Sequence, residues 1–290
     1  MNAQLVIVDP QNDFCIADDG NGHKGSLVVP GGLEDMQRLA AMVQRVGPKL
    51  DDIHVTMDSH QNFGIERPRW WKRLGDGAPP DPFTILGIHP DGKRIVKLDP
   101  TNGMAPTEEE YVTYLPGLQT RSFAYLQTLA AGGRYPHVVW PVHCVVWEWG
   151  WGVVSELAAA LSEWEFGQGS TPGRVNLVTK GNNPYTEHFS GIRAEVPDPE
   201  DPSTQVNTRL IQTLEEADIV AVGGEALSHC VANTIRDIAD SFSDPKYVEK
   251  LVLLTDASSN VGGFDFLGDA FMQEMLAKGM KTSTTVEFLS

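Results

Sequence analysis

Short apolar runs alternate with longer amphipathic stretches along most of this 290-residue chain. Six runs have the length of β-strands and few polar positions: residues 5–8, 53–57, 138–142, 175–178, 219–222 and 251–254. Five stretches between them space their apolar residues as helices do: residues 33–46, 151–161, 208–214, 231–242 and 266–276. Strands that are apolar on both faces and alternate with helices predict a parallel sheet covered on both sides. The pattern therefore predicts an α/β fold with a doubly wound, mainly parallel six-stranded sheet, and a short strand at 282–288 would close one edge.

One segment breaks this alternation. Residues 75–136 are rich in Pro, Gly and Asp, with one weak strand pattern at 94–98 and one helical stretch at 123–131. A connection of roughly 60 residues far exceeds the ~2–6 residues of an ordinary βα loop. We expect a single domain over residues 1–290 with an insertion at about 75–136 on the rim of the sheet. A lid and an oligomer contact both remain open as its role.

Composition narrows the class of protein. The chain has 39 acidic and 22 basic residues, a formal charge of −17, and no basic patch, which argues against nucleic-acid binding. No apolar run approaches the ~20 residues of a membrane span, and no basic residue precedes the first apolar run as in an export signal. The three cysteines, Cys15, Cys144 and Cys230, are too few for a disulfide framework, so a reducing compartment is expected. We therefore expect a cytoplasmic protein that binds neither nucleic acid nor membrane.

Reactive side chains follow the expected strands. In doubly wound sheets, ligands bind outside the carboxyl ends of the strands, so residues at those ends are brought to one rim. Five strands contribute such residues here, in chain order Asp9, Asp58 with His60, His143, Lys180 and Cys230. This accumulation predicts an active site at the carboxyl edge of the sheet.

Cys230 is the candidate nucleophile. It lies where a strand gives way to a helix, and the helix dipole with its unpaired N–H groups would favour a thiolate and hold an oxyanion. Asp9 could accept the thiol proton, and Lys180 could stabilise the resulting charge. His229 is a second candidate base, ranked below Asp9 because successive residues at a helix start point in different directions. A cysteine that merely packs in the core is the alternative.

Asp58, His60 and His143 are the candidate metal ligands. The carboxylate and the first imidazole are two residues apart, which places both on one side of an extended segment. One carboxylate and two histidines would leave metal positions open for water or substrate. Ordinary polar rim residues are the alternative. Trp70 and Trp71 follow this segment and could wall a flat aromatic substrate; packing in the core is the alternative.

Three ordered motifs carry a family resemblance. Residues 6–14 (VIVDPQNDF) resemble the opening strand and turn of the isochorismatase-like cysteine hydrolases, in which the Asp is the catalytic acid and base. Residues 178–181 (VTKG) are similar to that family's lysine strand, and residues 224–231 (GEALSHCV) resemble its nucleophile segment. The resemblance implies the isochorismatase-like hydrolase fold and a catalytic Asp9, Lys180 and Cys230. It also implies a cis peptide before Ala226, an oxyanion hole from the N–H groups of Ala226 and Cys230, and a substrate contact by Phe14.

The metal motifs point to one branch of that family. Asp58-x-His60 and residues 140–144 (WPVHC) are similar to the metal ligands of nicotinamidases. This resemblance implies a small-molecule amide substrate, hydrolysed from nicotinamide to nicotinate and ammonia. It also implies a divalent metal ion, zinc first and iron or manganese next, that binds the pyridine nitrogen.

The sequence also departs from that branch. A third histidine near position 64 or 67 is absent, and Arg67 and Arg69 would place positive charge near the pocket. The same three catalytic residues would also serve a carbamoyl or ureido amidase or a vinyl ether hydrolase, and a binding protein without turnover is a further alternative. The number of subunits stays open, a homo-oligomer included.

Overall fold

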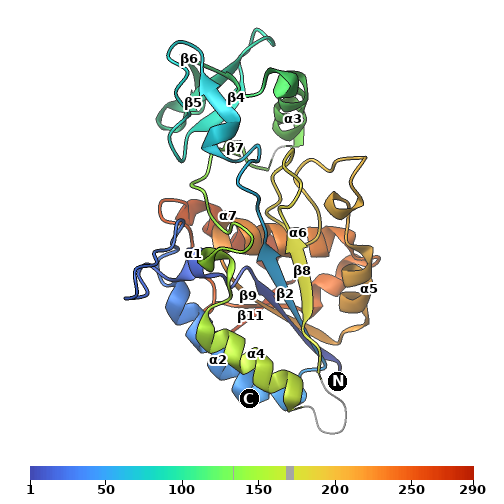
Figure 1. Ribbon diagram of the computed structural model, residues 1–290. Coiled ribbons are helices and arrows are strands. Elements are labelled where there is room, and N and C mark those ends of the chain that lie inside the picture. The colour runs from blue at the N-terminus through green and yellow to red at the C-terminus, as the bar shows by residue number, and fades with distance from the viewer. Residues whose placement is uncertain (133, 168–172) are drawn as a thin grey trace.

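The computed structural model describes residues 1–132, 134–167 and 173–290, so residue 133 of the expected insertion lies outside the described residues (Figure 1). At its centre is a six-stranded sheet in the order β11-β10-β9-β1-β2-β8, in which every pair of neighbours is parallel. The strands are β1 (Ala3–Val8), β2 (Asp52–Asp58), β8 (Asn176–Lys180), β9 (Ile219–Gly224), β10 (Leu251–Leu254) and β11 (Lys281–Ser283). The doubly wound α/β fold class is confirmed.

Helices cover both faces of this sheet (Figure 1). All six residues of β1 are buried, because β1 pairs with β2 and β9 and is covered above and below. One face carries α2 (Gly32–Val46) and α4 (Ser155–Phe166); the other carries α5 (Thr208–Glu216), α6 (Ala232–Ser241) and α7 (Asp265–Ala277). Shorter helical turns connect the elements: α1 (Asn12–Cys15), Gly47–Lys49, Pro68–Trp70, Pro100–Asn102, Pro116–Leu118, Trp149–Trp151, Pro202–Thr204 and Pro245–Lys250.

The expected strand at 138–142 does not belong to the parallel sheet, which corrects the sequence-based assignment. Only β7 (His137–Val138) is extended there, and it pairs antiparallel with β4 (Ile85–Ile88). Pro141 lacks the N–H that a central strand must donate, which disfavours continuing the strand. The sixth strand of the parallel sheet is instead β11, at the start of the segment 282–288 expected to close an edge.

A second sheet forms largely from the insertion, in the order β3-β6-β5-β4-β7. Besides β4 and β7 it contains β3 (Trp71–Arg73), β5 (Ile95–Asp99) and β6 (Ala105–Thr113), and it packs against α3 (Gln119–Gly132). Most of its apolar residues form a core of their own, whereas Ile85 and Val138 belong to the core of the parallel sheet. One weak strand had been expected in the insertion. That strand is β5. The sequence did not reveal β6, because this strand carries three successive glutamates and few of its residues are buried.

The antiparallel sheet and α3 stand beyond the carboxyl ends of β2 and β8, which is where ligand sites of such folds lie (Figure 1). Among the described residues, none of the helices combines the length and apolar character that a membrane crossing requires.

Candidate active site

Three side chains predicted to act together meet at the carboxyl edge of the parallel sheet. Asp9 follows β1, Lys180 ends β8, and Cys230 lies in a π-helical turn (η7, Leu227–Val231) between β9 and α6. The Nζ of Lys180 is 2.8 Å from Oδ2 of Asp9 and 3.7 Å from Sγ of Cys230. The negative charge of Asp9 also acts on the Cys230 thiol and helps to raise its pKa. The structure thus brings together a sulfur, a carboxylate and an ammonium from three distant parts of the chain.

Lys180 is buried, and its ammonium contacts several acceptors. Its Nζ also lies 3.1 Å from Oδ1 of Asp58 and donates to the backbone oxygen of His188 at 3.1 Å. Burial opposes the charge, but the carboxylates of Asp58 and Asp9 outweigh it and raise the pKa of Lys180 well above its usual value. The lysine is therefore a permanent positive charge beside the sulfur.

The resting site holds a thiol. Burial raises the pKa of Cys230 well above its usual value, although Lys180 opposes this. Burial likewise raises the pKa of Asp9, whose Oδ1 accepts a 2.6 Å hydrogen bond from the Thr56 hydroxyl. Because α6 begins only at Ala232, its N-terminus is not at the sulfur itself. Burial thus acts against the thiolate that the helix dipole was expected to favour.

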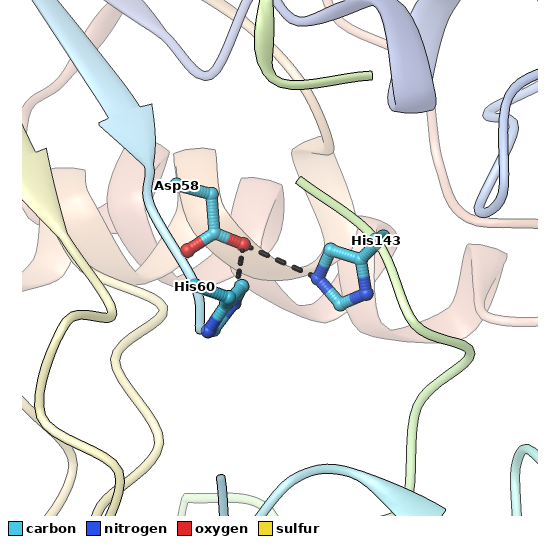
Figure 2. Close-up of side chains that lie close together, drawn as sticks. All are labelled: Asp58, His60 and His143. Atoms are coloured by element: carbon cyan, nitrogen blue, oxygen red, sulfur yellow. Dashed lines mark hydrogen bonds and ion pairs between the residues drawn. The ribbon is translucent and has the colours of Figure 1, made fainter. Parts of the chain in front are cut away.

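The candidate metal ligands also converge (Figure 2). The Nε2 atoms of His60 and His143 lie 2.9 Å and 3.2 Å from the same atom, Oδ2 of Asp58. One ligand atom from each residue lies within 4.8 Å of the others, and all three residues are buried. Two imidazole nitrogens and one carboxylate oxygen suit a divalent cation such as zinc.

His143 reaches this site from a loop and not from a strand of the parallel sheet. Two backbone hydrogen bonds tie the loop to the end of β2: from His60 N to Cys144 O at 3.1 Å, and from Val146 N to His60 O at 3.1 Å. The backbone N–H of Cys144 also donates to Oδ2 of Asp13 at 2.6 Å. The loop therefore delivers the imidazole to the place where a strand end was expected.

Asp58 joins the two groups. Its Oδ1 faces Lys180 and its Oδ2 faces both imidazoles. Although burial opposes charge on Asp58, the neighbouring charges of His60 and Lys180 hold its pKa well below the usual range. The group of Asp9, Lys180 and Cys230 and the candidate metal ligands thus share one carboxylate.

Gly181 makes this close packing possible. Its φ is +79°, and a Cβ there would lie 2.8 Å from Oδ1 of Asp58 and 2.9 Å from Cε1 of His60. Any side chain would displace both residues.

A cavity opens onto Cys230 between the two groups. Phe14 and Ala226, both expected at the site, lie on its wall. The remaining lining residues are Leu27, Asp58, Trp140, His143, Glu187, Phe189, His229, Cys230 and Val261. Three aromatic side chains thus face a site that also presents the nucleophile.

Trp70 and Trp71 lie elsewhere, which corrects their expected role as substrate walls. Each is 1% exposed in the core of the antiparallel sheet. The indole N–H of Trp70 donates to the Ser122 hydroxyl, and that of Trp71 donates to the backbone oxygen of Ile65. Both are core residues of the second sheet, because β3 carries their segment away from the cavity.

Arg67 and Arg69 do not line the cavity either. Arg67 is fully buried and paired with Glu66, 2.9 Å from Nε to Oε1, whereas Arg69 is exposed. The positive pocket expected from these arginines is therefore not formed by them.

Glu187 and Phe189 line the cavity, although the sequence had assigned them no role in the site. Burial raises the pKa of Glu187 to about 7, and Glu187 comes from the loop after β8 that folds back over the cavity. Phe189 lies on the same loop. Neither a periodicity nor a strand end marks these residues in the sequence, because the path of a loop depends on tertiary contacts.

His229 also lines the cavity, but its contacts do not make it a base for Cys230. Its Nδ1 lies 2.9 Å from the Ser228 hydroxyl, and its ring packs against Tyr135 and Trp140. Burial lowers its pKa to about 4, so the imidazole is neutral at neutral pH. This agrees with the lower rank given to it beside Asp9.

Solved structures share this architecture. The yeast nicotinamidase is 21% identical over 97% of this chain and 98% of its own, with a TM-score of 0.59. The pyrazinamidase of Pyrococcus horikoshii, in complex with zinc, is 17% identical over 98% and 99%, with a TM-score of 0.53. An isochorismatase family protein of Desulfovibrio vulgaris is 14% identical over 99% and 96%, with a TM-score of 0.50. No protein-family model matches the chain, and no curated protein has a matching sequence. At these identities the likeness establishes the architecture: the protein has the isochorismatase-like hydrolase fold that nicotinamidases and pyrazinamidases share.

Proposed function

We propose that this protein is a cysteine amidohydrolase that cleaves a carboxamide C–N bond, with nicotinamide as its substrate. The observation that carries the proposal is the contact of Lys180 with both Asp9, at 2.8 Å, and the sulfur of Cys230, at 3.7 Å. A thiol beside a buried carboxylate and a fixed ammonium, open to a cavity, is an arrangement for nucleophilic catalysis.

The first half of the reaction forms a thioester. Asp9 takes the proton of the Cys230 thiol as the sulfur attacks the carboxamide carbon, and Lys180 stabilises the developing thiolate. The backbone N–H groups of Ala226 and Cys230 hold the oxyanion of the tetrahedral intermediate. Asp9 then gives its proton to the departing nitrogen, so ammonia leaves and the acyl group stays on the sulfur.

The second half releases the acid. A water molecule attacks the thioester carbon while Asp9 accepts one of its protons. Collapse of the second tetrahedral intermediate returns the carboxylic acid, and the proton held by Asp9 restores the Cys230 thiol. Because the carboxyl of Asp9 is held by Thr56 and Lys180, one group can serve every proton transfer without moving.

Asp58, His60 and His143 would hold a divalent cation, and their donor set of two nitrogens and an oxygen fits one. When bound, the cation would supply a Lewis acid that binds and orients the ring nitrogen of the substrate. We propose zinc as the metal, with iron or manganese as the alternatives; each accepts such a site.

The choice of nicotinamide rests on the cavity and on the likeness described above. The aromatic walls, Phe14, Trp140 and Phe189, suit a small flat ring, and His143 places a metal position beside the cavity. The yeast and P. horikoshii proteins of the same fold are a nicotinamidase and a pyrazinamidase.

Ammonia release by the purified protein tests the substrate. We expect ammonia from nicotinamide and pyrazinamide, because both present a carboxamide on a nitrogen-containing ring, and none from simple ureido or carbamoyl compounds. If only the ureido or carbamoyl compounds released ammonia, the proposed substrate would be wrong, while the proposed cysteine chemistry would stand. Binding of nicotinamide without release would favour a protein without turnover.

Metal content is the second test. We expect the purified protein to hold about one divalent metal ion per chain, as three protein ligands and an open position imply. His143→Ala should lose the metal, measured by elemental analysis, because only two ligands then remain. His89→Ala, in the antiparallel sheet, serves as the matched control and should keep it. A wild-type protein that is active without metal would contradict the proposed metal dependence.

We also propose a cytoplasmic location. Cys15, Cys144 and Cys230 are free and buried, and a working thiol nucleophile needs a reducing compartment.

A further inference from the structure

Arg67 is buried in a way that needs an explanation. A guanidinium carries a permanent charge and five N–H donors, and its burial is costly unless partners replace water. Arg67 is 0% exposed, yet it lies outside the cavity and contacts neither Cys230 nor Asp9 among the described interactions. Its partners lie instead around the candidate metal ligands.

The guanidinium holds the backbone that carries His143. Its Nη1 donates to the Pro141 carbonyl at 3.0 Å, and its Nη2 donates to the His143 carbonyl at 2.6 Å. The backbone of the preceding residue adds a third link to this segment, since Trp140 N donates to the Glu66 carbonyl at 2.9 Å. The loop that replaces the expected strand is thus held at three points by two adjacent residues.

The carboxylate of Glu66 connects this arginine to the other imidazole. Its Oε1 lies 2.9 Å from Nε of Arg67 and 3.3 Å from Nδ1 of His60. The pair Glu66–Arg67 therefore touches both histidines of the cluster: His60 through its ring, and His143 through its backbone and its ring.

These contacts also define how the rings present their nitrogens. Nδ1 of His143 lies 2.7 Å from the Pro141 carbonyl and 3.1 Å from Nη1 of Arg67, so both partners hold this ring at its Nδ1 edge. His60 has Glu66 behind its Nδ1 in the same way. Both Nε2 atoms therefore face Oδ2 of Asp58, where a bound cation would take their lone pairs (Figure 2).

We infer that Glu66 and Arg67 are positioning residues for the metal centre. Glu66 orients the ring of His60, and Arg67 fixes the backbone of His143, so that the site is prepared for the cation before it binds. This inference rests on the metal site of the proposed function. Loss of such outer partners lowers metal affinity by about 10–100-fold.

The test is Zn²⁺ affinity, measured by competition with a chromophoric chelator. Arg67→Gln and Glu66→Gln should each weaken Zn²⁺ binding by about 10–100-fold. Arg67→Lys keeps the positive charge but cannot make both hydrogen bonds of the guanidinium, so its Zn²⁺ affinity should lie between those of the wild type and Arg67→Gln. Turnover at saturating Zn²⁺ should recover, because neither residue lines the cavity. Arg69→Gln is the matched control: this exposed arginine lies two residues away, and its loss should change nothing.

A lone buried charge can prevent folding, so the double variant Glu66→Gln with Arg67→Gln removes both charges together. We expect it to fold, shown by near-ultraviolet circular dichroism, and to bind Zn²⁺ more weakly than the wild type. A folded double variant with wild-type Zn²⁺ affinity and only a lower melting temperature would overturn the inference. A wild-type protein that binds neither Zn²⁺ nor Mn²⁺ would overturn the metal site itself, which is a separate and recognisable result.

Discussion

Replacing Cys230 with alanine should lower kcat/KM for the amide by about 10⁴-fold or more and leave the fold intact. The reason is that Cys230 supplies the sulfur on which the covalent intermediate forms. Cys230 is 7% exposed at the cavity wall, and removal of its sulfur breaks no ion pair that holds the sheet together. Ammonia release measures the loss, and intact mass after rapid quenching should show the acyl adduct on the wild type only.

Cys15 offers the matched control for this variant. It is a buried free thiol, 3% exposed, that belongs to the main core and does not line the cavity. Cys15→Ala should therefore keep its turnover per folded molecule. Substantial ammonia release by Cys230→Ala, or an acyl adduct that persists in it, would refute the nucleophile.

Lys180→Met should cause the second large effect, on stability and on activity together. Its ammonium compensates two buried carboxylates, Asp9 at 2.8 Å and Asp58 at 3.1 Å. Without it both charges are buried with one partner fewer, and breaking a buried ion pair in this way costs about 3–5 kcal/mol. Chemical denaturation should show that fall in the free energy of unfolding, with turnover lost because nothing stabilises the thiolate.

Two further variants separate the loss of this ion pair from general effects of removing a lysine. Adding Asp9→Asn to Lys180→Met removes one uncompensated charge, so part of the stability should return while activity does not. Lys278→Met is the surface control, because Lys278 pairs with Glu274 with its side chain 42% exposed, and exposed pairs contribute about 0–1 kcal/mol. If Lys180→Met were as stable as the surface variant, the proposed charge balance of the site would be wrong.

The shared carboxylate of Asp58 affects how variants should be interpreted. Substitution at Asp58 removes a metal ligand and also a partner of Lys180, so its loss of activity would not separate the two sites. His143 is the better position for the metal test, because it contacts Oδ2 of Asp58 and lies away from the lysine. The nucleophile and the metal cluster form one connected network of charges, in which the state of one changes the field at the other.

Much of the parallel sheet could be predicted because the pattern of apolar residues within each segment marks it as a strand or a helix. The run at 5–8 is apolar at every position, a pattern that only a strand buried on both faces explains, and it became β1. Helices α2 and α6 follow from the spacing of their apolar residues in the same way. The placement of Asp9 and Lys180 followed as well, since parallel strands end at one edge.

The antiparallel sheet was largely missed for a physical reason. Its strands are short or polar and acquire their burial only by pairing with one another and with α3. Propensity in such strands reflects neighbours that the local sequence does not contain. The error in the roles of Trp70 and Trp71 has the same origin, because the sequence alone does not distinguish two tryptophans at a cavity wall from two tryptophans in a core.

The sequence by itself determined the parallel core, the carboxyl-edge location of the site and the residues able to do its chemistry, because periodicity and residue type are properties of the chain. Only the tertiary structure decided that His143 arrives on a loop, that Asp58 belongs to both groups, and that Glu66 and Arg67 stand behind the histidines. These facts depend on contacts between segments far apart in sequence. Their geometry follows from how the whole chain packs, which no short stretch of residues encodes.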